Sequence, residues 1–132
     1  MNYSTDNTRI IDRKKVPAPY ELINNLPIND DISKLVYGTR QEISQILHDK
    51  DDRLLVVVGP CSIHDPVSAI EYAKKLIHEN IKFKENLLIV MRVYFEKPRT
   101  TVGWKGLIND PNLDGTFKIN KGLRMARKVC HL

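Results

Sequence analysis

Met-Arg-Val-Tyr-Phe-Glu-Lys-Pro-Arg-Thr-Thr-Val-Gly-Trp-Lys-Gly-Leu, residues 91–107, joins the end of an apolar run to a loop rich in cations. Residues 87–95 are almost all aliphatic or aromatic, which is typical of a strand covered on both faces of a parallel sheet. Arg92 interrupts this run, and Lys97 and Arg99 follow it closely. Because ligands bind at the carboxyl ends of the strands in α/β folds, we expect the three cations at one binding edge.

Arg92 has two interpretations on the residues alone. Side-chain alternation places it on the same side of the strand as Val90 and Tyr94. A guanidinium inside a buried strand is costly unless an anionic group meets it. That group is either a ligand or the carboxylate of a structural salt bridge. Lys97 and Arg99 are likewise either ligand contacts or solvated charges.

The composition indicates one modest globular domain. The chain has 132 residues, of which 42% are hydrophobic and 28% charged, so it is neither disordered nor membrane-like. No apolar run approaches the roughly 20 residues of a membrane span, and the N-terminus lacks a signal-peptide core. The net charge of +5 suits anionic ligands, but the scattered cations without interleaved aromatics predict no nucleic-acid partner. Cys61 and Cys130 are expected to be free thiols of a cytoplasmic protein.

Capping residues and hydrophobic periodicity predict the remaining elements. Asp65 is a natural N-cap, and Pro66 fits the first helical position. Strand, helix and parallel strand within about forty residues form a βαβ unit. The prolines of residues 1–28 indicate an arm, either loosely attached or packed on a neighbouring subunit. The predicted order is this arm, a helix at 29–47, a strand at 54–58, a helix at 66–79, a strand at 87–95, and a helix at 120–129 capped by Asn120.

The sequence leaves the chemical role of Cys61 undetermined. It follows the first predicted strand at the level of Lys97, where a buried spectator, a nucleophile and a metal ligand are all possible roles. A closed zinc site needs four ligands, and no second pair accompanies Cys61 and His64; His64 is expected to support the turn before the next helix. Ser62 lacks a base and an acid for a triad. The glycines fit no phosphate-binding loop.

Three motifs resemble the microbial type I 3-deoxy-D-arabino-heptulosonate 7-phosphate (DAHP) synthases, also called phospho-2-dehydro-3-deoxyheptonate aldolases. They are Gly-Pro-Cys-Ser-Ile-His-Asp-Pro (59–66), Met-Arg-Val-Tyr-Phe-Glu-Lys-Pro-Arg-Thr (91–100) and Gly-Trp-Lys-Gly-Leu-Ile-Asn-Asp-Pro (103–111). The resemblance covers nearly the whole chain. It implies an aldol-type condensation of phosphoenolpyruvate with erythrose 4-phosphate and water, which releases phosphate and opens the shikimate pathway to the aromatic amino acids.

The same resemblance implies roles for individual residues and a cofactor. The cofactor is a divalent metal ion, with Mn, Fe, Co and Zn as the candidates. Lys97, near the reacting centre, is implied in proton transfer as well as in binding. The implied contacts are Cys61 for the metal, Arg92 and Lys97 for phosphoenolpyruvate, and Pro98, Arg99 and Thr100 for erythrose 4-phosphate.

The family fold is a (β/α)8 TIM barrel, which takes about 250 residues. We therefore expect this chain to be the N-terminal part of a longer enzyme. Residues 1–28 would form an arm for regulatory or oligomer contacts, and residues 29–132 would contain the first two βα units of the barrel. The family's other metal ligands, a His, a Glu and an Asp, would lie beyond it. The chain alone is expected to be inactive. The full-length protein is expected to be a homo-oligomer inhibited by an aromatic amino acid. The alternative is a non-catalytic remnant that binds phosphate or another subunit.

Overall fold

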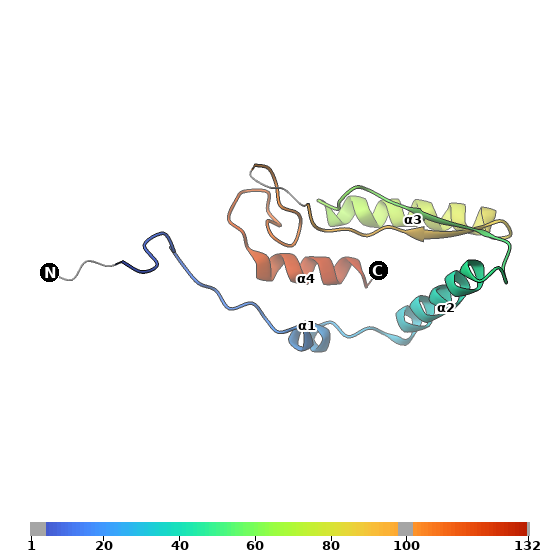
Figure 1. The fold of residues 1–132 in the computed structure, drawn as a ribbon, viewed down its shortest axis with the longest axis horizontal. Coiled ribbons are helices and arrows are strands. Elements are labelled where there is room, and N and C mark those ends of the chain that lie inside the picture. Colours follow the sequence, from blue (N-terminus) through green and yellow to red (C-terminus); the bar gives the residue numbers. More distant parts are fainter. Residues whose placement is uncertain (1–4, 98–101, 132) are drawn as a thin grey trace.

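The computed structural model describes residues 5–97 and 102–131. Figure 1 shows α3 and α4 running along a small sheet, while the N-terminal segment trails away from them. The two strands are parallel and paired in register, from Leu54 opposite Leu87 to Val58 opposite Met91. The predicted α/β class and βαβ unit are therefore confirmed. The elements are α1 (Pro19–Asn25), α2 (Asp30–Leu47), β1 (Leu54–Val58), α3 (Pro66–Phe83), β2 (Leu87–Met91) and α4 (Ile119–Val129).

Local capping starts α2 and α3 where the sequence predicts. Asn29 Oδ1 accepts a hydrogen bond from Ile32 N at 2.8 Å. Asp65 accepts from the backbone N–H groups of Val67 and Ser68, each at 3.0 Å, and Pro66 occupies the first position of α3. These side-chain oxygens satisfy helical N–H groups that have no intrahelical partner. The start of α3 fixes the loop that leaves β1.

An ionic cluster joins α2 to the start of β1. Arg53 Nη2 lies 2.7 Å from a carboxylate oxygen of Glu42 and 2.7 Å from one of Asp51. Hydrogen bonds from Arg53 lower the pKa of Asp51 below its ordinary value. Because Glu42 belongs to α2 and Arg53 immediately precedes β1, this contact ties the helix to the sheet.

The structure corrects two predicted element boundaries. β2 ends at Met91 instead of continuing to residue 95, and α3 continues to Phe83 rather than ending near residue 79. The predicted cap of the last helix is also wrong. Asn120 lies inside α4, and its amide donates to the carbonyl of Lys15 at 2.9 Å.

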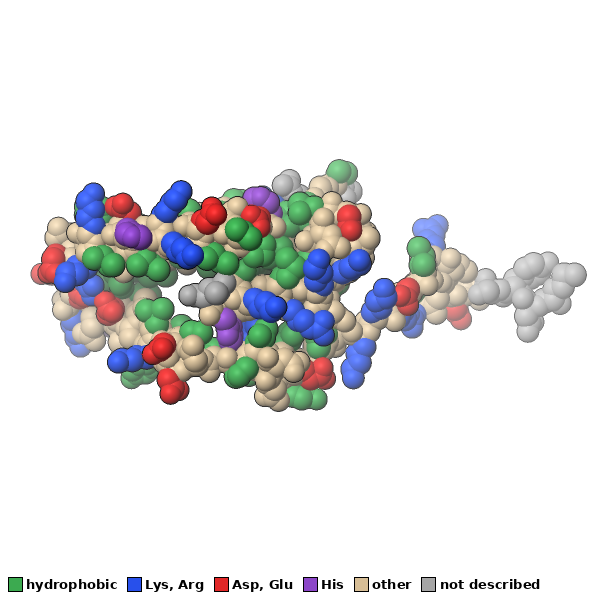
Figure 2. Space-filling view, turned by 180° about the vertical axis from the view of Figure 1, so that it is seen from behind, with side chains coloured by type: hydrophobic (Ala, Val, Ile, Leu, Met, Phe, Trp, Pro, Cys, Tyr) green, Lys and Arg blue, Asp and Glu red, His purple; other side chains and the backbone are tan. Residues whose placement is uncertain are grey.

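The strands are less covered than an apolar run predicts. α3 packs against β2, but Leu54 and Val57 of β1 are 65% and 60% exposed. Figure 2 shows apolar side chains at the surface among charged ones. The prediction of strands buried on both faces is therefore wrong for the described residues. The packed core lies instead beyond the strand ends, around Ile63, Ala69 and Leu107, with Phe95, Trp104, Met125 and Val129 against it.

The cysteines and the helices bear on two further expectations, free thiols and the absence of a membrane span. Cys61 and Cys130 are both free thiols, as predicted. None of the helices among the described residues combines the length and apolar character that crossing a bilayer requires.

Candidate functional site

The segments that leave β1 and β2 stay side by side beyond the strand ends. Arg92 N donates to Val58 O at 2.8 Å, and Ile63 N donates to Tyr94 O at 2.8 Å. Between these bonds Gly59 lies directly against the Arg92 backbone, where a Cβ atom would collide with the Arg92 carbonyl. Only glycine allows so close an approach of two main chains. This pairing holds residues 59–63 and 92–94 together at the carboxyl edge of the sheet.

Arg92 lies just after β2 rather than inside it, which corrects the predicted placement. Its Nη1 donates to the carbonyls of Pro60 at 2.7 Å and Cys61 at 2.8 Å, and its Cζ lies 4.8 Å from the centroid of the Tyr94 ring. A guanidinium has five N–H donors, and these two bonds involve Nη1 alone. Among the described residues no carboxylate forms a salt bridge with Arg92, so the structural salt bridge considered for this residue is not observed. Backbone carbonyls and an aromatic face thus orient the Arg92 side chain.

Lys97 approaches Cys61 from the segment that follows β2. Lys97 Nζ lies 3.8 Å from Cys61 Sγ, and the Cys61 side chain is exposed. Cys61 is therefore not buried, and its chemical role stays a prediction. We call Cys61, Arg92 and Lys97 the strand-end cluster. The structure brings these predicted site residues together from two segments more than thirty positions apart. The two cations of this cluster suit an anionic ligand.

A short antiparallel pairing fixes the direction of Lys97. Lys97 N donates to Lys105 O at 3.1 Å, and Leu107 N donates to Phe95 O at 2.8 Å. Gly106 forms a bridge with Glu96 between these bonds. Gly106 has a φ of 113°, and a Cβ there would collide with the Phe95 carbonyl. We call residues 95–97 and 105–107 the clasp.

Residues within the clasp and next to it anchor it to the core. Leu107 is fully buried. Trp104 Nε1 donates to the Asp110 carbonyl at 2.8 Å, and Asn109 Nδ2 donates to Glu96 Oε2 at 2.5 Å. Sequence reasoning missed Glu96 and Asn109 as parts of the site. Both belong to the motifs that resemble the family, but no periodicity indicates that they meet.

The described residues do not complete a metal site. No group of three or more His, Cys, Asp or Glu side chains that could hold a metal ion occurs among residues 5–97 and 102–131. Cys61 can offer one thiolate, whereas structural and catalytic zinc sites take three or four protein ligands. His64 does not join Cys61 in such a group. Pro98, Arg99 and Thr100, predicted to contact erythrose 4-phosphate, lie outside the described residues.

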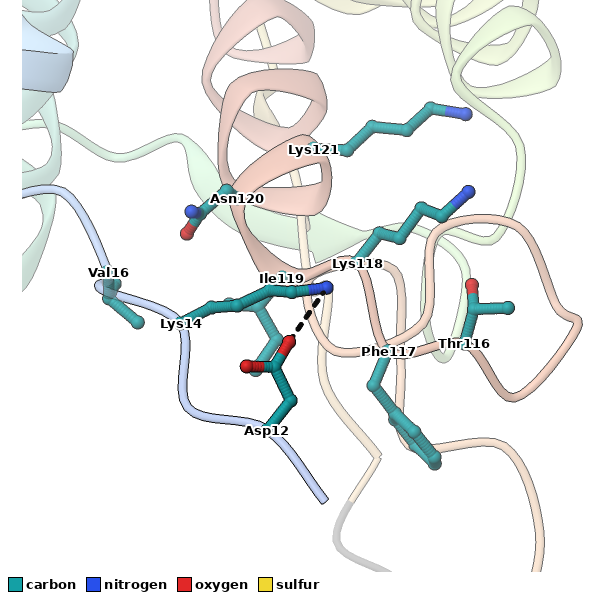
Figure 3. A pocket seen from close by; sticks show the side chains of 9 residues that line it. All are labelled: Asp12, Lys14, Val16, Thr116, Phe117, Lys118, Ile119, Asn120 and Lys121. Carbon is teal, nitrogen blue, oxygen red and sulfur yellow. Dashed lines mark ion pairs between the residues drawn. The ribbon is translucent and has the colours of Figure 1, made fainter. Parts of the chain in front are cut away.

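A separate hollow of about 400 Å³ lies between the N-terminal arm and the start of α4 (Figure 3). Lys14, Lys118 and Lys121 line it together with Phe117. The ammonium group of Lys14 pairs with Asp12 at 3.4 Å. Cys61, Arg92 and Lys97, the predicted site residues that the structure describes, do not line this hollow.

Comparison with known proteins adds independent information. Residues 25–129 match the DAHP synthetase I family. The Phe-sensitive phospho-2-dehydro-3-deoxyheptonate aldolase of Escherichia coli strain K12 is 55% identical over 129 residues, which are 98% of this chain and 37% of that protein. The Trp-sensitive aldolase of Buchnera aphidicola is 52% identical over 125 residues, which are 95% of this chain and 36% of that protein.

A solved structure shows the same similarity in three dimensions. The phospho-2-dehydro-3-deoxyheptonate aldolase of Francisella tularensis SCHU S4 is 51% identical and superimposes with a TM-score of 0.85. The match covers 92% of this chain and 37% of that one. This chain therefore spans little more than a third of the length of these relatives.

Proposed function

The chain belongs to the DAHP synthetase I family, and on that premise we propose that it forms the phosphoenolpyruvate-binding part of a DAHP synthase. The complete protein would condense phosphoenolpyruvate with erythrose 4-phosphate and water to DAHP and phosphate. The observation that carries the proposal is the convergence of Cys61, Arg92 and Lys97 at the ends of two parallel strands. The resemblance assigns these same positions to the metal and to phosphoenolpyruvate.

The geometry suits a small substrate with several negative charges. Phosphoenolpyruvate carries a carboxylate and a phosphate. The Arg92 nitrogens that do not bind the Pro60 and Cys61 carbonyls can form paired hydrogen bonds with one of these groups. Lys97 offers a compact ammonium to the other group. Each such charge-assisted contact contributes roughly 1.5–3 kcal/mol. Arg92 and Lys97 would thus hold the substrate where the next carbon–carbon bond forms.

Lys97 is the residue we propose for proton transfer. In the condensation the enol carbon of phosphoenolpyruvate bonds to the aldehyde carbon of erythrose 4-phosphate, and water adds to the carbon that bears the phosphate and loses a proton. The bond from that carbon to the phosphate oxygen then breaks, which leaves the ketone of the product and releases phosphate. The aldehyde oxygen gains a proton as the carbon–carbon bond forms. An ammonium held by the clasp beside the reacting atoms can supply it. Lys97→Ala should therefore chiefly lower the turnover number.

The second substrate, the metal and the complete fold are further parts of the proposal. The family resemblance supports Pro98, Arg99 and Thr100 as contacts of erythrose 4-phosphate. It also supports Cys61 as one ligand of a divalent metal ion, whose other ligands the described residues do not supply. The parallel βαβ unit and the similarity to the Francisella structure support a (β/α)8 barrel as the fold of the complete protein.

Regulation by an aromatic amino acid is also proposed. One relative is named Phe-sensitive and another Trp-sensitive, so the effector differs within closely similar proteins. We propose that an aromatic amino acid inhibits the complete protein. The part played by residues 1–28, a homo-oligomeric state and a cytoplasmic location stay predictions.

A chimera tests the proposed function. The 132-residue chain replaces the matching segment of the E. coli Phe-sensitive enzyme, and phosphate release is measured with both substrates. We expect turnover that depends on phosphoenolpyruvate and erythrose 4-phosphate, and none from the 132-residue chain alone. A folded chimera that binds phosphoenolpyruvate without turnover would favour the alternative, a non-catalytic phosphate-binding remnant.

A further inference from the structure

Glu96 places a carboxylate next to the strand-end cluster. It immediately precedes Lys97, whose ammonium lies 3.8 Å from Cys61 Sγ. Successive side chains of an extended backbone point to opposite sides, and the Glu96 carboxylate accordingly meets Asn109 Nδ2 at 2.5 Å. The two neighbouring charges, Glu96 and Lys97, therefore face different parts of the protein.

The position of Asn109 is set by rigid surroundings. Asn109 follows the clasp by two residues, after Leu107, which is fully buried. Asp110 N donates to Gly106 O at 2.9 Å, and the Asp110 carbonyl accepts from Trp104 Nε1 at 2.8 Å. Because the backbone on both sides of Asn109 is held, its amide remains beside Glu96.

We infer that Asn109 is a positioning residue that holds the Glu96 carboxylate outside the strand-end cluster, so that Arg92 and Lys97 meet an anionic substrate instead of Glu96. The inference rests on the proposed function, because it names the substrate as the anion that benefits. A partly buried carboxylate without a donor is unfavourable. Without the Asn109 amide the Glu96 carboxylate loses this donor, and the ammonium of Lys97, the next residue, is a cation of the cluster toward which it can turn.

The experiment measures binding of phosphoenolpyruvate, and of inorganic phosphate as a second probe, by calorimetric titration of the 132-residue chain and of the chimera. Asn109→Ala should weaken binding about tenfold, the effect of one displaced charge-assisted contact. Asn109→Ala combined with Glu96→Gln should recover the original affinity within about twofold, because no carboxylate remains to enter the cluster. In the chimera the KM for phosphoenolpyruvate should rise, and kcat should fall with it, because a displaced Glu96 also engages Lys97, the proposed proton donor. Glu96→Gln should restore both values.

A matched control lies in the same loop. Asn112 Nδ2 donates to Asp114 Oδ2 at 3.2 Å, and Asn112 Oδ1 accepts from Lys121 Nζ at 2.6 Å. Asn112→Ala therefore removes side-chain hydrogen bonds that involve no residue of the cluster and should leave binding unchanged. Circular dichroism checks that each variant is folded. If Asn109→Ala is not folded, Asn109→Asp takes its place. This variant keeps the side-chain shape, repels Glu96 and should likewise be rescued by Glu96→Gln.

The outcomes separate this inference from the proposed function. Binding that is unchanged by Asn109→Ala, or a loss that Glu96→Gln does not restore, overturns the positioning role and leaves the proposed function intact. Asn109-dependent binding in a chimera without turnover supports the inference and contradicts the proposed activity. A wild-type segment that binds neither probe, alone or in the chimera, overturns both.

Discussion

The strand-end cluster and the N-terminal arm are held in different ways. Main-chain hydrogen bonds join the segments around the cluster, such as Ile63 N to Tyr94 O and Lys97 N to Lys105 O. Side chains of α4 hold the arm: Asn120 donates to the Lys15 carbonyl and Arg127 to the Leu26 carbonyl, each at 2.9 Å. The cluster therefore depends on backbone geometry that few substitutions can reach directly. The arm depends on individual side chains.

The largest predicted effect comes from Gly106, whose backbone contact closes the clasp. Gly106→Ala adds a Cβ that collides with the Phe95 carbonyl, at a φ of 113°. We expect the free energy of unfolding to fall by roughly 3 kcal/mol or more, as measured by urea denaturation. Gly115 is a matched control, because it has a φ of 71° but a Cβ added there would meet no atom within 4 Å. Gly115→Ala should cost only about 1 kcal/mol. Equal losses would show that close packing at Gly106 is unimportant.

A smaller effect on stability should depend on pH. It belongs to Asp65, which caps the helix that follows β1. Hydrogen bonds from Ser68 and Val67 lower the pKa of Asp65 below its ordinary value. A lowered folded pKa adds stability that is complete above about pH 4, the ordinary carboxyl range, and is lost as pH falls through the folded value. Asp65→Ala should therefore be less stable than wild type at neutral pH, with a gap that closes in acid.

Asp65→Asn provides the control for that titration. It keeps a good N-cap without the ionisable group, so its stability should depend less on pH than that of wild type between about pH 4 and 2. The arm contacts are made by an amide and a guanidinium on carbonyls, and they should persist over this range. A gap between Asp65→Ala and wild type that stays constant down to about pH 2 would contradict the assignment.

The smallest predicted effect on stability belongs to the arm. Arg127→Ala removes the bonds to the Leu26 carbonyl and should lower the free energy of unfolding by about 1 kcal/mol or less. Cleavage by chymotrypsin near Tyr20 should become faster, whereas phosphoenolpyruvate binding should not change. Lys128→Ala, at an exposed position of the same helix, should alter neither property. A loss of phosphoenolpyruvate binding in Arg127→Ala would show that the arm and the cluster are coupled.

The predictable parts of the fold are those determined by neighbouring residues. Asp65 and Pro66 mark the start of α3 because a cap acts within one turn, and the aliphatic run of residues 54–58 marks β1. The end of β2 is not predictable in this way because the apolar run continues to residue 95, where the backbone instead pairs with residues 105–107. Asn120 resembles a cap in sequence, but its actual partner, Lys15, is about a hundred positions away.

The candidate site divides in the same way. Cys61, Arg92 and Lys97 can be singled out because they interrupt or follow apolar runs, at the strand ends where ligands bind in α/β folds, and because the family motifs contain them. Glu96 and Asn109 cannot, because their meeting depends on the clasp and on the buried Leu107. The aliphatic run of β1 predicts a covered strand, whereas the described residues leave Leu54 and Val57 largely exposed. An apolar run indicates that a strand needs cover. It does not indicate which segment supplies that cover.

The most direct test of the central claim is the steady-state kinetics of Arg92→Ala in the chimera, with each substrate varied in turn. Arg92 is already held by the Pro60 and Cys61 carbonyls, and we predict that its remaining donors bind phosphoenolpyruvate. The KM for phosphoenolpyruvate should rise roughly ten- to a hundredfold, as expected for loss of a charge-assisted contact, while the KM for erythrose 4-phosphate changes little. Arg124→Ala, at an exposed position of α4, should change neither value. Equal increases for both substrates, or no increase for phosphoenolpyruvate, would contradict the account.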